Sequence, residues 1–213
     1  MDIWLTQIAV HPQCTRLWRR GLLDGDQLHR ELMHLVPDGL GEQPRRASGL
    51  LYRAEITRTG LRILAQTCIP PQLEKLSHDF VHSAQQRCIT GFLATLHAGM
   101  RVRYRIAANP TKRHGNTAEP HKRGKLAHLH GEQAELWWLR KATNVGLHPL
   151  QLHAAQLSDI RGTRDTRHGV TQFDGTAMVT DPQQLHTALI EGIGRAKTYG
   201  CGMLSLGPTQ EHS

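Results

Sequence analysis

One of the 15 histidines in this 213-residue chain, His29, stands where a side chain could transfer protons. An imidazole titrates near pH 6.5, so it can accept or donate a proton under neutral conditions. Residues 27–36 place Leu28, Leu32 and Leu35 on one stripe of a helix, with His29 at the edge of that stripe. Packing can therefore hold the ring while it faces a groove. By position alone, a structural histidine is the more common outcome.

Positive charge gathers in one window of the sequence. The chain carries 26 Lys and Arg against 18 Asp and Glu, a formal net charge of +8. Residues 101–125 supply nearly all of that surplus, because eight bases there are opposed by a single acid, Glu119. The eight bases are Arg101, Arg103, Arg105, Lys112, Arg113, Lys122, Arg123 and Lys125. Such a block favours a nucleic-acid partner, since each neutralised phosphate releases a counterion. A solvated strand face with a flexible basic loop is the alternative.

The first three bases alternate along the chain, which indicates one face of a strand. Arg101, Arg103 and Arg105 would then stand about 7 Å apart, a spacing that suits a phosphate backbone. The chain has only three Phe and three Tyr, and it shows no aromatic motif that would stack unpaired bases on a sheet. The sequence therefore favours recognition of a duplex stem by its backbone and shape.

Other function classes find little support. No stretch reaches the roughly 18–20 apolar residues of a membrane span, and the N-terminus lacks a signal-type pattern, so we expect a cytoplasmic protein without membrane partners. Neither His78–His82 nor His128–His130 has a Cys or carboxylate at metal-ligand spacing, so we expect no metal and no cofactor. Four widely spaced cysteines indicate reduced structural thiols: Cys14, Cys68, Cys88 and Cys201.

The two halves of the chain repeat one order of elements. The first half predicts helices at 27–36 and 70–76 and strands at 3–10, 49–56, 61–67 and, more weakly, within 85–97. The second half predicts helices at 132–142 and 181–190 and strands at 100–107, 150–158, 171–179 and 203–206. Each half has the order β-α-β-β-α-β of the ferredoxin-like (RRM-like) fold. We therefore predict an α+β protein with two tandem ferredoxin-like domains, residues 1–97 with His29 and residues 98–213 with the basic loop and a glycine-rich turn.

Four segments of the sequence resemble a known family. They are WLTQ at 4–7, DQLHREL at 26–32 with Val36-Pro37 after it, YRIAANPTK at 104–112, and GIGRAKTYGCGMLSLGP at 192–208. These segments lie in both halves and nearly reach both ends of the chain. In this order they resemble the CRISPR-associated endoribonuclease of type I-E systems, the guide-processing CasE subunit of the Cascade complex.

The resemblance implies both a fold and an activity. It implies two ferredoxin-like domains, binding of the CRISPR repeat stem-loop, and metal-independent cleavage of precursor crRNA at the 3′ base of the stem. The upstream product is expected to end in a 2′,3′-cyclic phosphate, and the protein is expected to stay bound to the crRNA among the other Cascade subunits. That cleavage uses the neighbouring 2′-hydroxyl as nucleophile, which confines the substrate to RNA.

The resemblance also assigns roles to residues. His29 matches the family's catalytic histidine, and Arg30, Lys112 and Lys197 are expected to contact RNA. His34 matches a position that is basic in relatives. Its side chain could equally contact a phosphate or be a solvated surface histidine. Many relatives carry Tyr where this chain has Asp26, and we expect Asp26 to cap the helix, with support of His29 as the alternative. This departure keeps open a second hypothesis, a catalytically idle RNA-binding subunit.

Overall fold

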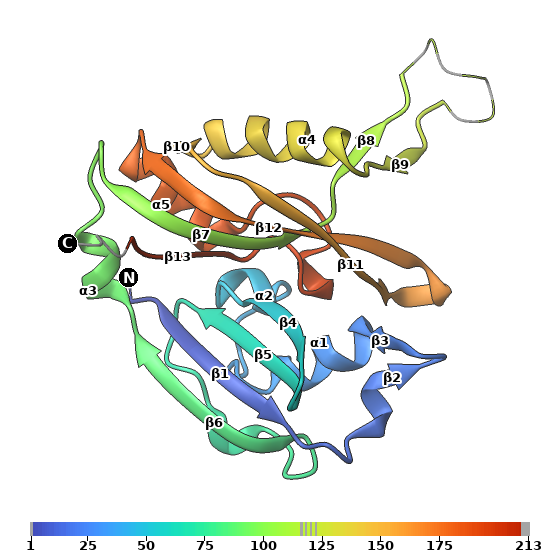
Figure 1. Ribbon diagram of the computed structural model, residues 1–213. Coiled ribbons are helices and arrows are strands. Elements are labelled where there is room, and N and C mark those ends of the chain that lie inside the picture. Colours follow the sequence, from blue (N-terminus) through green and yellow to red (C-terminus); the bar gives the residue numbers. More distant parts are fainter. Residues whose placement is uncertain (1, 116, 118, 120, 122, 210–213) are drawn as a thin grey trace.

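The computed structural model describes residues 2–115, 117, 119, 121 and 123–209. It is an α+β structure with two main β-sheets, one built mainly from each half of the chain, and a small two-stranded sheet (Figure 1). The two ends of the described chain lie on the same side of the molecule, next to helix α3 (Thr90–Ala94). Within this described part no helix is long and apolar enough to span a membrane.

The N-terminal sheet has the strand order β4-β5-β1-β6. The predicted strands at 3–10, 49–56 and 61–67 are confirmed as β1 (Trp4–Val10), β4 (Leu51–Thr57) and β5 (Gly60–Thr67). The fourth strand, β6 (Val81–Cys88), begins before the predicted window of 85–97 and is followed there by α3. The second helix is reduced to the 3-10 turn η2 (Leu73–Lys75), and a short helix, α2 (Pro44–Ala47), precedes β4.

Helix α1 (Gly25–Met33) carries the histidine of interest, and its start corrects one expectation. The carboxylate of Asp24 accepts the backbone N–H groups of Asp26 and Gln27, so Asp24 and not Asp26 is the cap. Leu28 and Leu32 are fully buried on the inner face of the helix, as the stripe predicted. The helix ends three residues earlier than the predicted 27–36.

The C-terminal sheet has the order β13-β7-β12-β11, the second ferredoxin-like arrangement. Its strands are β7 (Arg101–Ala108), β11 (His153–Arg161), β12 (Arg167–Val179) and β13 (Leu204–Pro208), with the short β10 (Leu147–Pro149) paired to β12. Helices α4 (Glu132–Thr143) and α5 (Pro182–Glu191) cover one face. The hairpin of β8 (Thr111–Arg113) and β9 (Leu126–His128) projects from the end of this unit (Figure 1).

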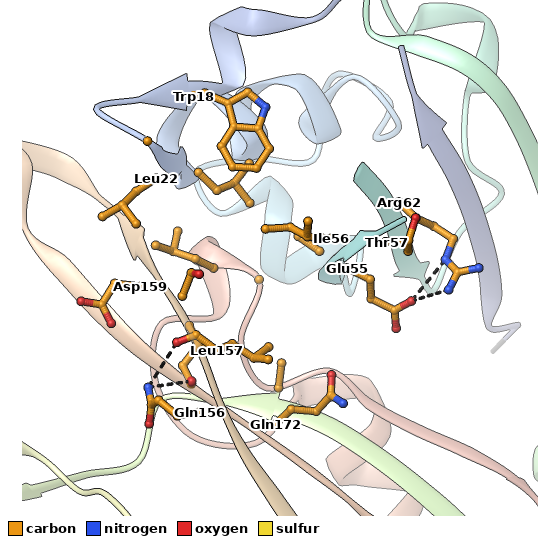
Figure 2. Close-up of a pocket in the computed structure, with 18 of the residues that line it drawn as sticks. Trp18, Leu22, Glu55, Ile56, Thr57, Arg62, Gln156, Leu157, Asp159 and Gln172 are labelled. Carbon is orange, nitrogen blue, oxygen red and sulfur yellow. Dashed lines mark hydrogen bonds and ion pairs between the residues drawn. The ribbon is translucent and has the colours of Figure 1, made fainter. Parts of the chain in front are cut away.

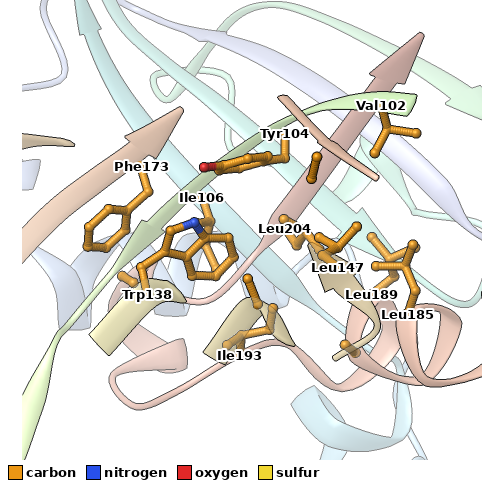
Figure 3. Packing of buried hydrophobic residues seen from close by; sticks show 14 of the residues in the cluster. Val102, Tyr104, Ile106, Trp138, Leu147, Phe173, Leu185, Leu189, Ile193 and Leu204 are labelled. Carbon is orange, nitrogen blue, oxygen red and sulfur yellow. The ribbon is translucent and has the colours of Figure 1, made fainter. Parts of the chain in front are cut away.

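Aromatic packing fixes α4 on its sheet. The fully buried Trp138 stacks on Phe173 with ring centroids 5.7 Å apart and contacts Tyr104 at 5.5 Å (Figure 3). Such offset pairs add to the free energy gained by burying the rings. The alternation predicted for β7 is confirmed, because Val102, Tyr104 and Ile106 all face this core.

One segment of the N-terminal half joins the C-terminal sheet. After the turn η1 (Thr15–Leu17), strands β2 (Trp18–Arg19) and β3 (Leu22–Asp24) extend that sheet, with β3 parallel to β11. Helix α1 therefore starts from the edge of the opposite unit and lies at the seam between the two. The domain boundary between residues 97 and 98 falls between α3 and β7 and stays a prediction.

Candidate active site and RNA-binding surface

His29 lies in the middle of α1 at the seam, half-buried. Its Nδ1 atom is buried and has no hydrogen-bond partner among the described residues. Burial lowers the pKa of His29 below 6.5, and the nearby positive charge of Arg45 lowers it further, while Asp26 opposes both. The ring is therefore neutral at pH 7, the form that accepts a proton.

Asp26 joins α1 to the opposite unit instead of capping it. The hydroxyl of Thr163, in the turn η3 (Thr163–Asp165), donates to Asp26 Oδ1 at 3.0 Å. The same hydroxyl lies 3.1 Å from the phenol oxygen of Tyr199, in the turn η4 (Lys197–Tyr199). A carboxylate one turn before His29 is thus fixed by groups from the C-terminal unit.

Close packing at Gly25 makes this arrangement possible. A Cβ atom there would lie 2.7 Å from Tyr199 Cδ1, 2.9 Å from Ile160 Cγ2 and 3.0 Å from the carbonyl oxygen of Arg161. All three distances are shorter than an ordinary carbon contact of about 3.5–4.0 Å. Glycine therefore lets the first turn of α1 rest directly on η4 and β11.

One cation, Arg45, lies near His29, and Arg46 and Lys197 lie near Arg45. Lys197 donates from Nζ to the carbonyl oxygen of Glu191 at 2.7 Å, and Arg45 donates to the carbonyl oxygen of Leu50 at 3.0 Å. Burial, with Arg45 next, lowers the pKa of Lys197, while burial, then Arg46, lowers that of Arg45. Arg45 contributes to the shifts of both Lys197 and His29, so it is the common neighbour of these two side chains. Clustered cations of this kind stabilise a phosphate on which negative charge develops.

The two other predicted residues of α1 lie away from this cluster. His34 is the C-cap, with its side chain 54% exposed and Nδ1 3.9 Å from Glu31 Oε1. It lies about 140° around the helix from His29, so the structure does not bring the two rings together. Arg30 is exposed and donates from Nε to the carbonyl oxygen of Asp26 at 3.3 Å.

The three arginines of β7 share one strand face, yet their environments differ. Arg101 and Arg103 are exposed, and Arg103 donates from Nε to the carbonyl oxygen of Pro208 at 3.0 Å. Arg105 instead pairs with Asp174 and lies 3.6 Å from Glu55 of β4, between the two sheets. Its positive charge is largely satisfied within the protein, which leaves less of it for a phosphate than the sequence pattern suggested.

The remaining predicted cations lie on the β8–β9 hairpin or its connecting loop. Lys112, Arg113 and Lys125 are exposed, and Arg113 also donates to the carbonyl oxygen of Gly124. Arg123 lies in the same loop, while Lys122 falls outside the described residues. A basic arm therefore extends beyond the sheet (Figure 1).

A wide cleft of about 600 Å³ lies between the units, and among the described residues Arg105 is the one predicted site residue in its lining. Figure 2 shows Trp18, Leu22, Ile56 and Leu157 along its walls, with Glu55 paired to Arg62 at one side. No histidine lines it within the described part of the chain. Its lining combines apolar side chains with the ion-paired Glu55 and Arg62 and with Asp159.

Sequence patterns missed several residues of the site. Arg45 and Arg46 follow Pro44 in a stretch without periodicity, and the adjacent arginines were the only available signal. Thr163 and Tyr199 approach Asp26 from positions more than 130 residues away, which no local pattern reports. Among the described residues no group of three or more His, Cys, Asp or Glu could hold a metal ion, and the four cysteines are free thiols.

Comparisons with known proteins place this geometry in a family. A family model described as "CRISPR associated protein" matches residues 3–208. The chain is 29% identical to the CRISPR-associated endoribonuclease Cse3 of Thermus thermophilus, covering 97% of this chain and 100% of the relative. It is 28% identical to the Cascade subunit CasE of Escherichia coli, covering 91% and 95%.

A solved structure extends the likeness to three dimensions. Thermus thermophilus Cse3, bound to an RNA that represents a pre-cleavage complex, superposes with a TM-score of 0.79 at 26% identity. That match covers 98% of this chain and all of the other. The chain therefore belongs to the CRISPR-associated protein family and, within it, to the type I-E CasE group that its motifs resemble.

Proposed function

We propose that this chain is an endoribonuclease that binds the CRISPR repeat stem-loop and cleaves precursor crRNA at the 3′ base of the stem. Family membership supports the substrate and the reaction class, because its relatives are named as an endoribonuclease and a Cascade subunit. The observation that carries the catalytic assignment is the half-buried His29, whose pKa is lowered and whose Nδ1 lacks a partner among the described residues.

His29 acts as the base in the proposed reaction. The 2′-hydroxyl gives its proton to the neutral imidazole, and its oxygen attacks the adjacent phosphorus in line. The bond from phosphorus to the 5′-oxygen breaks, that oxygen takes up a proton from water, and the protonated His29 returns its proton to water. The products are a 2′,3′-cyclic phosphate and a 5′-hydroxyl, and the substrate itself supplies the nucleophile. We propose that the reaction needs no metal and no cofactor.

Arg45 beside His29, together with the cations around Arg45, stabilises the transition state. Negative charge on the phosphate oxygens grows as the 2′-oxygen attacks, and Arg45, Arg46 and Lys197 supply positive charge at that place. Asp26 counterbalances Arg45 at the imidazole, since its carboxylate raises the pKa of His29. We therefore assign Asp26 as a positioning residue, whereas His34, exposed and on another face of α1, takes no part in this step.

The basic arm holds the stem. Lys112, Arg113 and Lys125 are exposed on the C-terminal unit, and we propose that the phosphate backbone of the stem lies along them. Contacts by Arg30, Arg101 and Arg103 extend this surface, and the same role for Lys122 and Arg123 stays a prediction. The protein remains with the crRNA as a Cascade subunit, and we place it in the cytoplasm.

A second candidate is a catalytically idle hairpin-binding subunit, favoured by Asp26 at a position where many relatives have Tyr. One comparison separates the two functions: wild type against His29→Ala on the cognate repeat hairpin in excess chelator. A hairpin with 2′-deoxy at the cut site is the RNA control, and His34→Ala is the matched histidine control. The proposal is supported if wild type and His34→Ala cleave the hairpin and His29→Ala does not. The 2′-deoxy hairpin should stay intact with all three proteins. Tight binding without cutting by wild type would establish the idle subunit.

A further inference from the structure

A second cavity lies next to the proposed site, between the basic arm and η4. It has a volume of about 380 Å³, close to the lower end of ligand pockets, so it admits one nucleotide and excludes a helix. No acidic residue lines it within the described chain. The lining residues are Asn109, Thr111, Leu126, His128, Thr166, Arg167, His168, Arg195, Ala196, Thr198 and Tyr199.

Two stacked rings form part of the wall. The ring centroids of His168 and Tyr199 lie 4.3 Å apart with an angle of 20° between the planes. Burial, then His128, lowers the pKa of His168, so its ring is neutral at pH 7. Gly162 permits the close fit, because a Cβ there would lie 2.7 Å from His168 Nε2. Flat rings fixed in advance are what unpaired bases stack on in RNA-binding proteins.

Polar groups around the rings suit the remainder of a nucleotide. Arg167 and Arg195 are exposed, and neither has an ion-pair partner within the described residues. Asn109 donates from Nδ2 to the carbonyl oxygen of Gly169 at 2.7 Å and lies 3.3 Å from His128 Nδ1. If the same amide also donates to that ring, the proton of His128 sits on Nε2, where it is a donor. Guanidinium groups bind phosphate oxygens in a forked geometry.

The position of the cavity indicates which nucleotide enters it. Thr111, Leu126 and His128 belong to the arm that we propose holds the stem, while Tyr199 lies 3.1 Å from the hydroxyl that binds Asp26. With the stem on the arm and the cut at His29, as proposed above, the cavity would receive the RNA strand that leaves the base of the stem.

We propose that this cavity binds a single unpaired nucleotide beside the scissile phosphate, with its base on the His168–Tyr199 pair and its phosphate on Arg167 and Arg195. This inference rests on the proposed function, because it takes the cut to lie at His29. Anchoring the neighbouring nucleotide aligns the 2′-oxygen, phosphorus and 5′-oxygen for in-line attack.

The test removes one base at a time and measures the effect on binding and on cleavage. Hairpins with a single abasic site at each nucleotide flanking the cut are bound by His29→Ala protein, which cannot consume them, and are cleaved by wild type. We expect one abasic position to weaken binding or slow cleavage about 10-fold, the range of a lost stacking contact. In His168→Ala protein, and in the double variant with His29→Ala, an abasic site at that same position should cause no further loss of cleavage rate or affinity.

Two more variants guard against a folding defect. Arg195→Gln changes an exposed residue and should weaken binding of the intact hairpin several-fold, while His186→Ala, an exposed histidine on α5, should match wild type. An abasic effect of equal size with and without His168 would overturn the inference. If wild type does not cleave the hairpin, the proposed function is refuted. The affinities measured with His29→Ala protein still test this inference, because they do not depend on cleavage.

Discussion

Replacing Gly25 by alanine should misplace the catalytic helix while leaving RNA binding nearly intact. The added Cβ would lie 2.7 Å from Tyr199 Cδ1 and 3.0 Å from the carbonyl oxygen of Arg161, where about 3.5–4.0 Å is needed. The first turn of α1 must therefore move by about 1 Å. A misplacement of that size can cost about 100-fold in rate, because in-line attack tolerates little error.

The local effect of alanine acts in the opposite direction. Alanine favours a helix over glycine by up to about 1 kcal/mol, so a variant limited by helix formation would become more stable and stay active. We expect the packing conflict to dominate, because one of the clashing atoms belongs to the backbone and cannot rotate away. Single-turnover cleavage should fall about 100-fold with the dissociation constant of the hairpin changed by less than about 3-fold.

Gly91 provides the matched control for this experiment. It lies inside α3, and a Cβ atom there would meet nothing within 4 Å. Gly91→Ala should therefore cleave at the wild-type rate and unfold at the same or a slightly higher temperature. Wild-type cleavage by Gly25→Ala would refute the argument that this contact sets the position of His29.

Three further predictions concern the imidazole, the arm and the core. Arg45 lowers and Asp26 raises the pKa of His29, so Arg45→Gln should move the acidic limb of the pH–rate profile to higher pH and Asp26→Asn should move it to lower pH; shifts in the same direction would contradict the assignment. Replacing Lys112, Arg113 and Lys125 together by Ala should reduce the slope of log affinity against log salt by about 2–3, whereas an unchanged slope would place the stem elsewhere. Trp138→Ala should lower the free energy of unfolding by about 3–5 kcal/mol in urea titrations, and a loss below about 1 kcal/mol would show that the aromatic stack adds little.

Local patterns predicted most of the fold. Alternation placed β1, β4, β5 and β7 within a residue or two, because each strand buries one face and exposes the other. Strand β6 was placed too late because its residues, Val81–Cys88, are mostly polar and exposed on both faces. An edge strand without an apolar face leaves no periodic signal.

Contacts between distant segments could not be predicted in this way. Strand β3 pairs with β11, so Leu23 meets Ile160 across more than 130 residues, and only the folded chain brings them together. The cap of α1 shows a smaller failure: the sequence analysis predicted Asp26, whereas Asp24, two residues earlier, accepts the N–H groups of the first turn. Asp26 instead accepts a hydrogen bond from the hydroxyl of Thr163, and this contact determines its role in the site.

The family motifs pointed to His29, while its surroundings came only from the structure. Sequence alone gave Lys197 a place in a glycine-rich turn, but the charges of Arg45 and Arg46 beside it depend on how α2 packs at the seam. The row of arginines on β7 was correctly assigned to one face. Its last member, Arg105, pairs with Glu55 of the opposite sheet, a contact between distant segments that the strand pattern does not report.

The central claim is that His29 accepts the proton of the 2′-hydroxyl, and a modified substrate tests it most directly. In a hairpin whose 5′-oxygen at the cut is replaced by sulfur, the leaving group departs without an acid, so only the base remains necessary. If His29 is the base, His29→Ala should cleave this hairpin about 100- to 10,000-fold more slowly than wild type does, the usual contribution of such a group. Cleavage of the sulfur hairpin by His29→Ala at the wild-type rate would contradict the account and make His29 the acid.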